Sequence, residues 1–213
     1  MEIAPGLHRV GDDVIAAYLM IDDTGVTVVD AALPGYRREL RRELAAIGRT
    51  EADIRAILLT HADPDHVGFA EAVRAETGAT VYASAADRER ATGREQAPKT
   101  AMPPLRLAPA LRFVWTGLTH AGWSRPIAEV TAVGDGEVLP VPGRPRAVAV
   151  PGHTPGSLCW VSEEFDAVFV GDALTTRHVL TGRVGPQDAP FSEDEQEARQ
   201  SLEKLRGLDV RHV

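Results

Sequence analysis

The sequence contains a single cysteine, Cys159, few aromatic residues and no long apolar run. One cysteine excludes an intramolecular disulfide and a cysteine-rich zinc module. Aromatic residues make up 5% of the 213 residues, so the core must be built mainly from alanine, valine, leucine and isoleucine. Because no apolar stretch approaches the roughly 20 residues that cross a bilayer, no membrane partner is expected.

Basic residues are also scarce relative to acidic ones. The 23 lysines and arginines face 31 aspartates and glutamates, which gives a net charge of −8 and argues against a nucleic-acid partner. The first six residues lack the basic start and apolar stretch of a signal peptide, which predicts a cytoplasmic protein. The length and the 44% apolar composition predict a single folded domain over residues 1–213.

The first third of the chain alternates predicted strands with predicted helices. Residues 14–21 and 26–29 are apolar runs around a polar turn, which predicts an antiparallel hairpin. Helical spacing follows at residues 36–47 and again at 67–77, where Gly78 ends the helix. Between them, residues 54–59 read as a strand buried on both faces.

The remainder begins with a proline-rich segment and then returns to short strands. Residues 93–125 are too apolar for a linker and too rich in proline for a long helix, so we expect a packed cover segment. Strands are predicted at 146–150, 157–161, 167–170 and 209–213, and a helix is predicted to open with the capping box Ser192-x-x-Glu195. This order fits two packed sheets covered by helices, and a three-layer α/β fold would give a similar order.

Four side chains able to bind a divalent cation occur together where the strand at 54–59 ends: His61, Asp63, Asp65 and His66. Imidazole nitrogens and carboxylate oxygens are donors that zinc, iron and manganese accept. The alternative is an ordinary helix start, with Asp63 as the N-cap, Pro64 in the first turn and the histidines incidental.

Two further polar residues follow later strands. His153 lies in a turn of proline and glycine after residues 146–150, and Asp172 follows residues 167–170. Alone, such a histidine is usually solvated and such an aspartate usually caps a turn. Polar groups at the ends of several strands can, however, meet at one edge of a rigid scaffold.

Together these motifs resemble the metallo-β-lactamase superfamily. The resemblance rests on Thr60-His61-x-x-x-Asp65-His66, then Gly-His153-Thr-Pro-Gly, then Gly-Asp172, with Val-Val-Asp30 earlier, and it extends from about Leu7 to the end. It implies an α/β (α+β) fold, an αββα four-layer sandwich with a metal site at one edge of the two sheets.

The resemblance also implies roles for individual residues. His61 and His153 resemble ligands of a first metal, Asp65 and His66 resemble ligands of a second, and Asp172 resembles the carboxylate that bridges both. Asp30 resembles an aspartate beside the ligands. The cofactor implied is Zn²⁺, as one or two ions, with iron or manganese as alternatives.

The sequence departs from the family pattern at two places. The family has histidine where this chain has Asp63, which either coordinates through oxygen, tilting the preference toward iron or manganese, or caps the helix. The family's last ligand is a histidine in a turn after the final strand, and we expect that turn beyond Val213. His212 is an alternative, and a weakly held second metal is another.

Three residues of the cover segment, Trp115, His120 and Trp123, are candidates for a substrate-binding wall, with ordinary packing as the alternative. Two other histidines receive less weight. His8 is expected at the surface, and His178 lies on a loop near Asp172.

The predicted function is a metal-dependent hydrolase acting on a small ester-like molecule, such as a thioester or a lactone, through a metal-bound hydroxide. Asp65 is the candidate catalytic residue, orienting the nucleophile and passing a proton to the leaving group. The alternatives are an iron-dependent oxidoreductase, similar to sulfur dioxygenases or diiron proteins, and a non-catalytic scaffold with a degraded metal site. The oligomeric state is left open.

Overall fold

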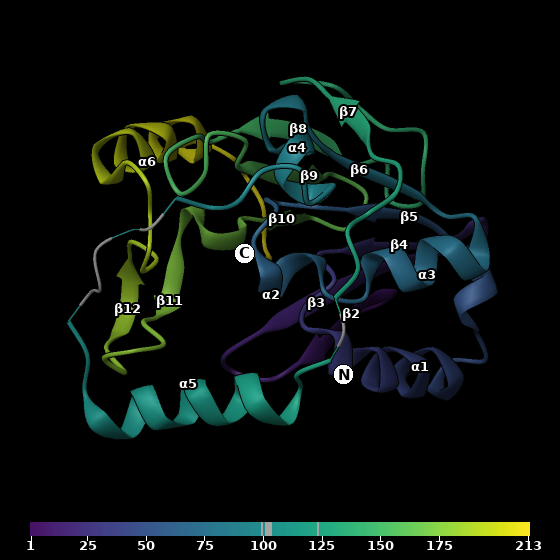
Figure 1. The fold of residues 1–213 in the computed structure, drawn as a ribbon. Coiled ribbons are helices and arrows are strands. Elements are labelled where there is room, and N and C mark those ends of the chain that lie inside the picture. The colour runs from purple at the N-terminus through teal and green to yellow at the C-terminus, as the bar shows by residue number, and fades with distance from the viewer. Residues whose placement is uncertain (99, 101–103, 123) are drawn as a thin grey trace.

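The computed structural model describes residues 1–98, 100, 104–122 and 124–213, which form three sheets flanked by helices (Figure 1). The largest sheet has seven strands in sequence order: β1 (Glu2–Ala4), β2 (Leu7–Gly11), β3 (Ala16–Asp22), β4 (Gly25–Val29), β5 (Ile54–Leu58), β6 (Thr80–Ser84) and β7 (Thr131–Val133). A second sheet has the order β10 (Ala167–Phe169), β9 (Leu158–Ser162), β8 (Arg146–Ala149). A separate hairpin joins β11 (Thr175–Arg177) and β12 (Val184–Gln187).

The large sheet is mixed. Strands β1 to β4 pair antiparallel, and β4 to β7 pair parallel. The predicted hairpin is confirmed as β3 and β4, and Asp22 shapes its turn by accepting hydrogen bonds from the backbone N–H groups of Thr24 at 2.7 Å and Gly25 at 3.2 Å. The parallel half brings the carboxyl ends of β4, β5 and β6 to the same edge.

Helices cover both outer faces of the packed sheets. The longer helices are α1 (Arg37–Ala46), α3 (Ala70–Thr77), α5 (Leu107–Thr119) and α6 (Glu195–Ser201); the shorter ones are α2 (Pro64–Val67) and α4 (Arg88–Ala91). Single 3₁₀ turns lie at η1 (Pro34–Tyr36), η2 (Glu51–Asp53), η3 (Ala85–Asp87), η4 (Gly171–Ala173) and η5 (Leu202–Leu205).

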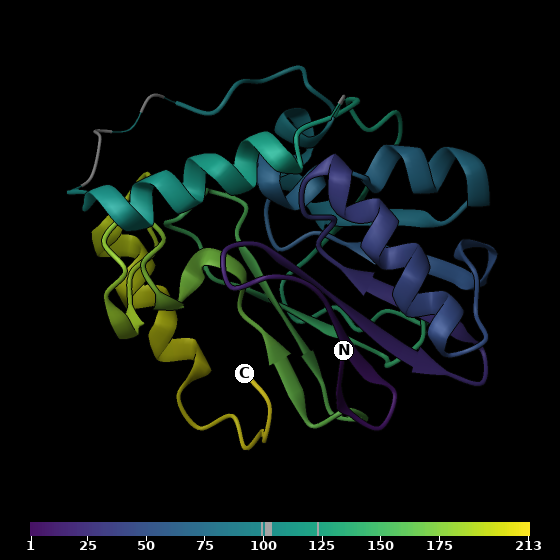
Figure 2. The same ribbon diagram turned by 90° about the horizontal axis from the view of Figure 1, so that it is seen from below.

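Alternation along the strands divides the core into layers, because successive strand residues face opposite sides. Val28 of β4 packs with Leu40 of α1, whereas Val29 packs with Trp160 of β9 between the sheets. Cys159 of β9 faces the other way and packs near Leu205 of η5. The resulting order is helix, sheet, sheet, helix, which confirms the predicted αββα sandwich (Figure 2).

The prediction for the proline-rich segment is wrong in one respect, because residues 107–119 form the regular helix α5. Pro109 is its third residue, and the N–H groups of the first turn have no partner within a helix, so proline costs no hydrogen bond there. The first such bond runs from the N–H of Ala110 to the carbonyl of Arg106 at 3.0 Å.

Two predicted boundaries near the C-terminus are also wrong. Helix α6 is capped by Asp194, whose carboxylate accepts from the N–H of Glu197, and not by Ser192. Residues 209–213 form no strand; His212 makes one isolated bridge to Ala167.

His8, expected at the surface, is buried and its Nδ1 lies 2.8 Å from a Glu43 carboxylate oxygen.

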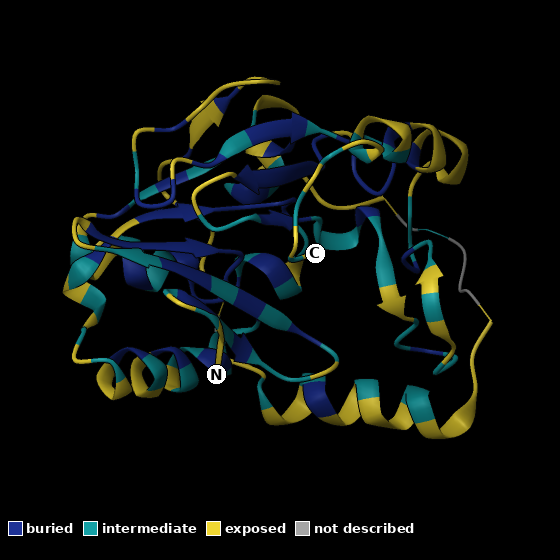
Figure 3. Ribbon diagram, turned by 180° about the vertical axis from the view of Figure 1, so that it is seen from behind, coloured by how far each residue is buried: buried dark blue, intermediate teal, exposed yellow. Residues whose placement is uncertain are grey.

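Burial is concentrated in the paired sheets, while much of α5 is exposed (Figure 3). Among the described residues, no helix combines the length and the apolar character needed to span a bilayer.

Candidate metal centre

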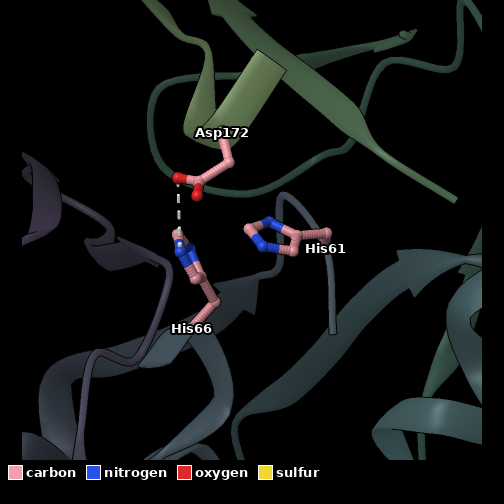
Figure 4. Close-up of side chains that lie close together, drawn as sticks. All are labelled: His61, His66 and Asp172. Atoms are coloured by element: carbon pink, nitrogen blue, oxygen red, sulfur yellow. Dashed lines mark ion pairs between the residues drawn. The ribbon is translucent and has the colours of Figure 1, made fainter. Parts of the chain in front are cut away.

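The three motifs that follow β5, β8 and β10 meet at one edge of the sheets. Figure 4 shows His61 and His66 facing Asp172, with His66 Nε2 3.5 Å from Asp172 Oδ1. His153 joins them: its Nε2 lies 3.4 Å from Asp63 Oδ2 and 3.7 Å from Asp172 Oδ2. The expected convergence of separate strand ends is therefore observed.

Within the described residues, two overlapping groups have the donor geometry of a metal site. One consists of His61, His66 and Asp172, and the other of His61, Asp63 and His153; in each, the donor atoms lie within 4.8 Å of one another. Both groups contain two imidazoles and one carboxylate, a set that divalent transition metals accept.

The far side of each imidazole is held by a specific partner. His61 Nδ1 lies 3.0 Å from the Thr60 hydroxyl, His66 Nδ1 lies 2.9 Å from Asp30 Oδ2, and His153 Nδ1 lies 3.1 Å from the Ser192 hydroxyl. Such contacts orient a metal-binding histidine and select its tautomer.

These partners hold each ring by Nδ1, so that Nε2 points into the site. The Thr60 hydroxyl donates its only hydrogen to Asp30 at 2.8 Å, so it must accept from His61 Nδ1–H. In the same way the Ser192 hydroxyl donates to the Ala189 carbonyl at 3.2 Å and accepts from His153. His66 Nδ1–H donates to the Asp30 carboxylate.

His61 Nε2 supplies the strongest indication that an ion belongs here. The atom is buried and has no hydrogen-bond partner among the described residues. A buried polar atom without a partner costs free energy, and a cation would remove that cost. The donor set and this free lone pair fit a divalent metal.

Asp63 does not act as a side-chain N-cap. It occupies the N-cap position of α2, with Pro64 next, but its carboxylate accepts no capping hydrogen bond. Instead Oδ2 lies near His61 and His153, at 3.7 and 3.4 Å, and Oδ1 lies 3.5 Å from Arg90 Nη1. Asp63 thus holds the N-cap position, while its carboxylate contacts the histidines and Arg90 and not the helix N-terminus.

Asp87 is a structural residue of the site that sequence reasoning missed. This buried carboxylate accepts from the N–H of Ala62 at 3.0 Å, the hydroxyl of Thr154 at 2.8 Å and the N–H of Gly156 at 2.9 Å. It therefore ties the loop of His61 to the loop of His153. An isolated aspartate at the start of a short helix carries no sequence signal for such a role.

Burial and charge shift the ionisation of the site residues. Burial lowers the pKa of His61 well below 6.5, and His66 and His153 act in the same direction. Burial also opposes the charged form of His66, but Asp30 and Asp65 raise its pKa well above its ordinary value. Burial raises the pKa of Asp65, and Asp172 adds to that effect while His66 opposes it.

A cavity of about 750 Å³ opens beside the cluster, and His66, His153, Asp65 and Asp172 lie in its wall. From α5 it is lined by Phe113 and Gly117, and of the predicted wall residues that the structure describes, neither Trp115 nor His120 lines it.

Trp115 is 67% exposed on α5, and His120 stacks on Tyr36 with ring centroids 3.9 Å apart. Trp123 lies outside the described residues. His178 Nδ1 accepts from the backbone N–H groups of its own turn, and His212 lines the cavity without entering either ligand group.

Comparison with known proteins decides the family, because the family model described as the metallo-beta-lactamase superfamily matches residues 10–212. The chain belongs to the metallo-beta-lactamase superfamily. Its mixed sheets are those of the metallo-beta-lactamase fold. The metallo-beta-lactamase family protein TTHA1429 of Thermus thermophilus superposes over 100% of this chain and 73% of its own, with a TM-score of 0.69 at 23% identity.

Several curated proteins are similar to this chain over much of its length. YobT of Bacillus subtilis, described as uncharacterized, is 30% identical over 169 residues, which cover 76% of this chain and 63% of YobT. The "Probable metallo-hydrolase YflN" of the same organism is 24% identical over 98% of this chain and 82% of its own. The chain therefore spans less than two thirds of the length of YobT and 82% of the length of YflN.

Proposed function

We propose that this member of the superfamily is a metal-dependent hydrolase that cleaves an ester-like bond, such as a thioester or a lactone, in a small molecule. The observation that carries the proposal is the set of three histidines whose Nε2 atoms lie 3.4 to 3.7 Å from carboxylate oxygens of Asp63 and Asp172. Two relatives in Bacillus subtilis, YflN and YqgX, each carry the name "Probable metallo-hydrolase". A third, from Aspergillus fumigatus, is named "Atrochrysone carboxyl ACP thioesterase" and is 37% identical over 81 residues.

In this proposal the ligand residues divide between two positions that share one carboxylate. His61, Asp63 and His153 would hold one cation, Asp65 and His66 would hold another, and Asp172 would lie between them. A divalent cation there supplies Lewis acidity and lowers the pKa of water toward neutrality.

Asp65 is the proposed proton carrier. Its side chain is 36% exposed, and its Oδ2 lies 3.8 Å from His66 Nε2, so Asp65 borders both the cavity and the cluster. In the absence of a cation, burial raises the pKa of Asp65, and the proposed role rests on its position beside the cluster and the cavity. Asp65 would take the proton of the attacking water and deliver it to the departing oxygen or sulfur.

Zn²⁺ is the proposed ion, with iron or manganese as alternatives. Two nitrogens with one carboxylate oxygen, as in His61, Asp63 and His153, form a harder donor set than three nitrogens. The preference for zinc should therefore be weaker than at an all-histidine position.

The test is elemental analysis of the purified protein combined with hydrolysis of p-nitrophenyl acetate and of an acetyl thioester. We expect a bound divalent metal and turnover that a chelator abolishes and added Zn²⁺ or Mn²⁺ restores. A metal-loaded protein that cleaves neither substrate would overturn the proposal.

An iron-dependent oxidoreductase is the second candidate, because two histidines and one carboxylate also form the facial arrangement that leaves iron open positions. Assays with and without dioxygen separate the two. Turnover that requires both iron and dioxygen would replace the hydrolase proposal. A protein that retains no metal after reconstitution would instead indicate a scaffold with a degraded site.

A further inference from the structure

Away from the ligands, the cavity presents more apolar than polar surface, although charged side chains, among them Arg9, Asp12, Asp13, Arg177 and Arg211, also line it. Its volume of about 750 Å³ falls within the range of small-molecule sites. Aromatic and aliphatic side chains from both sheets and from the surrounding segments line it: Leu7, Tyr18, Phe113, Phe169, Leu174 and Phe191. An apolar cavity of this size favours an apolar ligand, because burying apolar groups releases them from water.

Helix α5 forms one wall of this cavity and is anchored at three points. At its start, the N–H of Arg106 donates to the carbonyl of Leu180 at 2.9 Å. At its end, the carbonyl of His120 accepts from the N–H of Gly35 at 3.0 Å. Between them, an ion pair of 3.2 Å joins Arg112 to Asp13. The helix thus runs as a strap from the β11–β12 hairpin to the start of α1 (Figures 1 and 2).

The inward face of the strap leaves room for a ligand. Phe113 and Gly117 both line the cavity and are one helical turn apart, so they share a face. A Cβ placed on Gly117 would meet no atom within 4 Å, which shows open space at this point. Leu118, the next residue, is 70% exposed and faces away from the cavity.

We propose that the substrate is an ester or thioester of a hydrophobic acid, with the acyl chain beneath α5 and the carbonyl at the metal cluster. The bond cleaved rests on the proposed function, whereas the binding of the chain rests on the cavity alone. In hydrolysis, water adds its oxygen to the acyl carbon, the acyl bond to oxygen or sulfur breaks, and the released group takes the proton.

Binding is tested on the metal-free protein by calorimetry with the straight-chain carboxylates from butyrate to decanoate. Each additional pair of buried methylenes should strengthen binding roughly fifteenfold, the equivalent of about 0.8 kcal/mol per CH₂. Equal affinity for butyrate and decanoate would overturn the inference, and this series needs no variant that could fail to fold.

Gly117→Phe places a ring in the open space and should weaken decanoate binding at least tenfold. Leu118→Phe is the matched control, because the same ring then points outward, and it should bind decanoate like the wild type. Unchanged binding by Gly117→Phe would contradict the proposed position of the chain.

Hydrolysis of the acetyl to decanoyl thioesters by the metal-loaded protein separates this inference from the proposed function. If decanoate binds but no thioester is cleaved, the acyl-binding cavity is supported and the proposed hydrolase activity is refuted. If every thioester is cleaved at equal kcat/KM and decanoate does not bind, the hydrolase activity is supported and the acyl-binding cavity is refuted.

Discussion

Arg90 contacts the carboxylate of Asp63 on the oxygen that does not face the histidines. Its Nη1 lies 3.5 Å from Oδ1, while Oδ2 lies 3.4 Å from His153 Nε2. The Arg90 side chain is only 7% exposed, and its Nη2 binds Glu193 at 2.6 Å. The buried Arg90 guanidinium therefore lies next to Asp63, the position at which the family motif has histidine. Its positive charge favours a carboxylate there.

Replacing Arg90 should loosen Asp63 and weaken metal binding. In Arg90→Met the carboxylate loses its partner, and removal of a residue that holds a ligand typically costs 10- to 100-fold in metal affinity. Competition with a chromogenic chelator measures the change. Arg94→Met is the control, since Arg94 pairs with Glu89 at the surface, and this variant should bind metal normally. Equal affinity in both variants would show that Arg90 does not position Asp63.

Placing the family's histidine at position 63 should not improve metal binding while Arg90 is present. An imidazole that binds metal through one nitrogen presents N–H with the other, and a guanidinium also offers only donors. Asp63→His should therefore bind metal more weakly than the wild type, and Arg90→Gln should rescue it by supplying a carbonyl acceptor. The double-mutant cycle in metal affinity measures this coupling, and strict additivity would refute it.

Asp87→Asn should destabilise the fold by about 1–3 kcal/mol, because an amide cannot accept from all the donors that meet this buried carboxylate. Urea unfolding measures the loss, and Asp23→Asn at an exposed position is the control. Burial raises the pKa of Asp87 above 3.8, so its protonated form is favoured in the folded state. The wild type should therefore lose stability, relative to Asp87→Asn, as the pH rises from 3.8 through the raised pKa.

His61→Ala and His153→Ala, singly or together, should lose the ion that both residues reach, as measured by elemental analysis after dialysis against Zn²⁺. His178→Ala should retain it, because that ring serves a local turn. Full metal occupancy in the double variant would exclude the proposed centre.

Cys159 should resist alkylation in the native protein. It is buried in the layer between the small sheet and η5, and burial raises the pKa of its thiol to about 12, so the reactive thiolate is absent at neutral pH. Iodoacetamide followed by mass spectrometry should show modification only after unfolding. Hydrolytic activity should survive Cys159→Ser, and rapid labelling of the folded protein would contradict the assigned burial.

Local sequence patterns determined several of the strands and the motif residues of the candidate centre, whereas the four-layer order was implied by the family resemblance that those motifs carry. Alternation and helical spacing are set by neighbours in the chain. The motifs converge because the end of β5 in the large sheet and the ends of β8 and β10 in the second sheet lie at one edge of the packed sheets. Local patterns missed helix α5, because proline in a first turn costs no hydrogen bond. They also misplaced the start of α6, because the Ser192 hydroxyl contacts His153 and does not cap the helix.

Only the tertiary structure decided what surrounds the ligands. Asp87 meets Ala62 across 25 residues of sequence, and Arg90 meets Glu193 across 103. No periodicity or cap links positions so far apart, because these contacts exist only once the two sheets pack together and the buried charges must find partners. The apolar cavity under α5 has the same origin, since its walls come from segments throughout the chain.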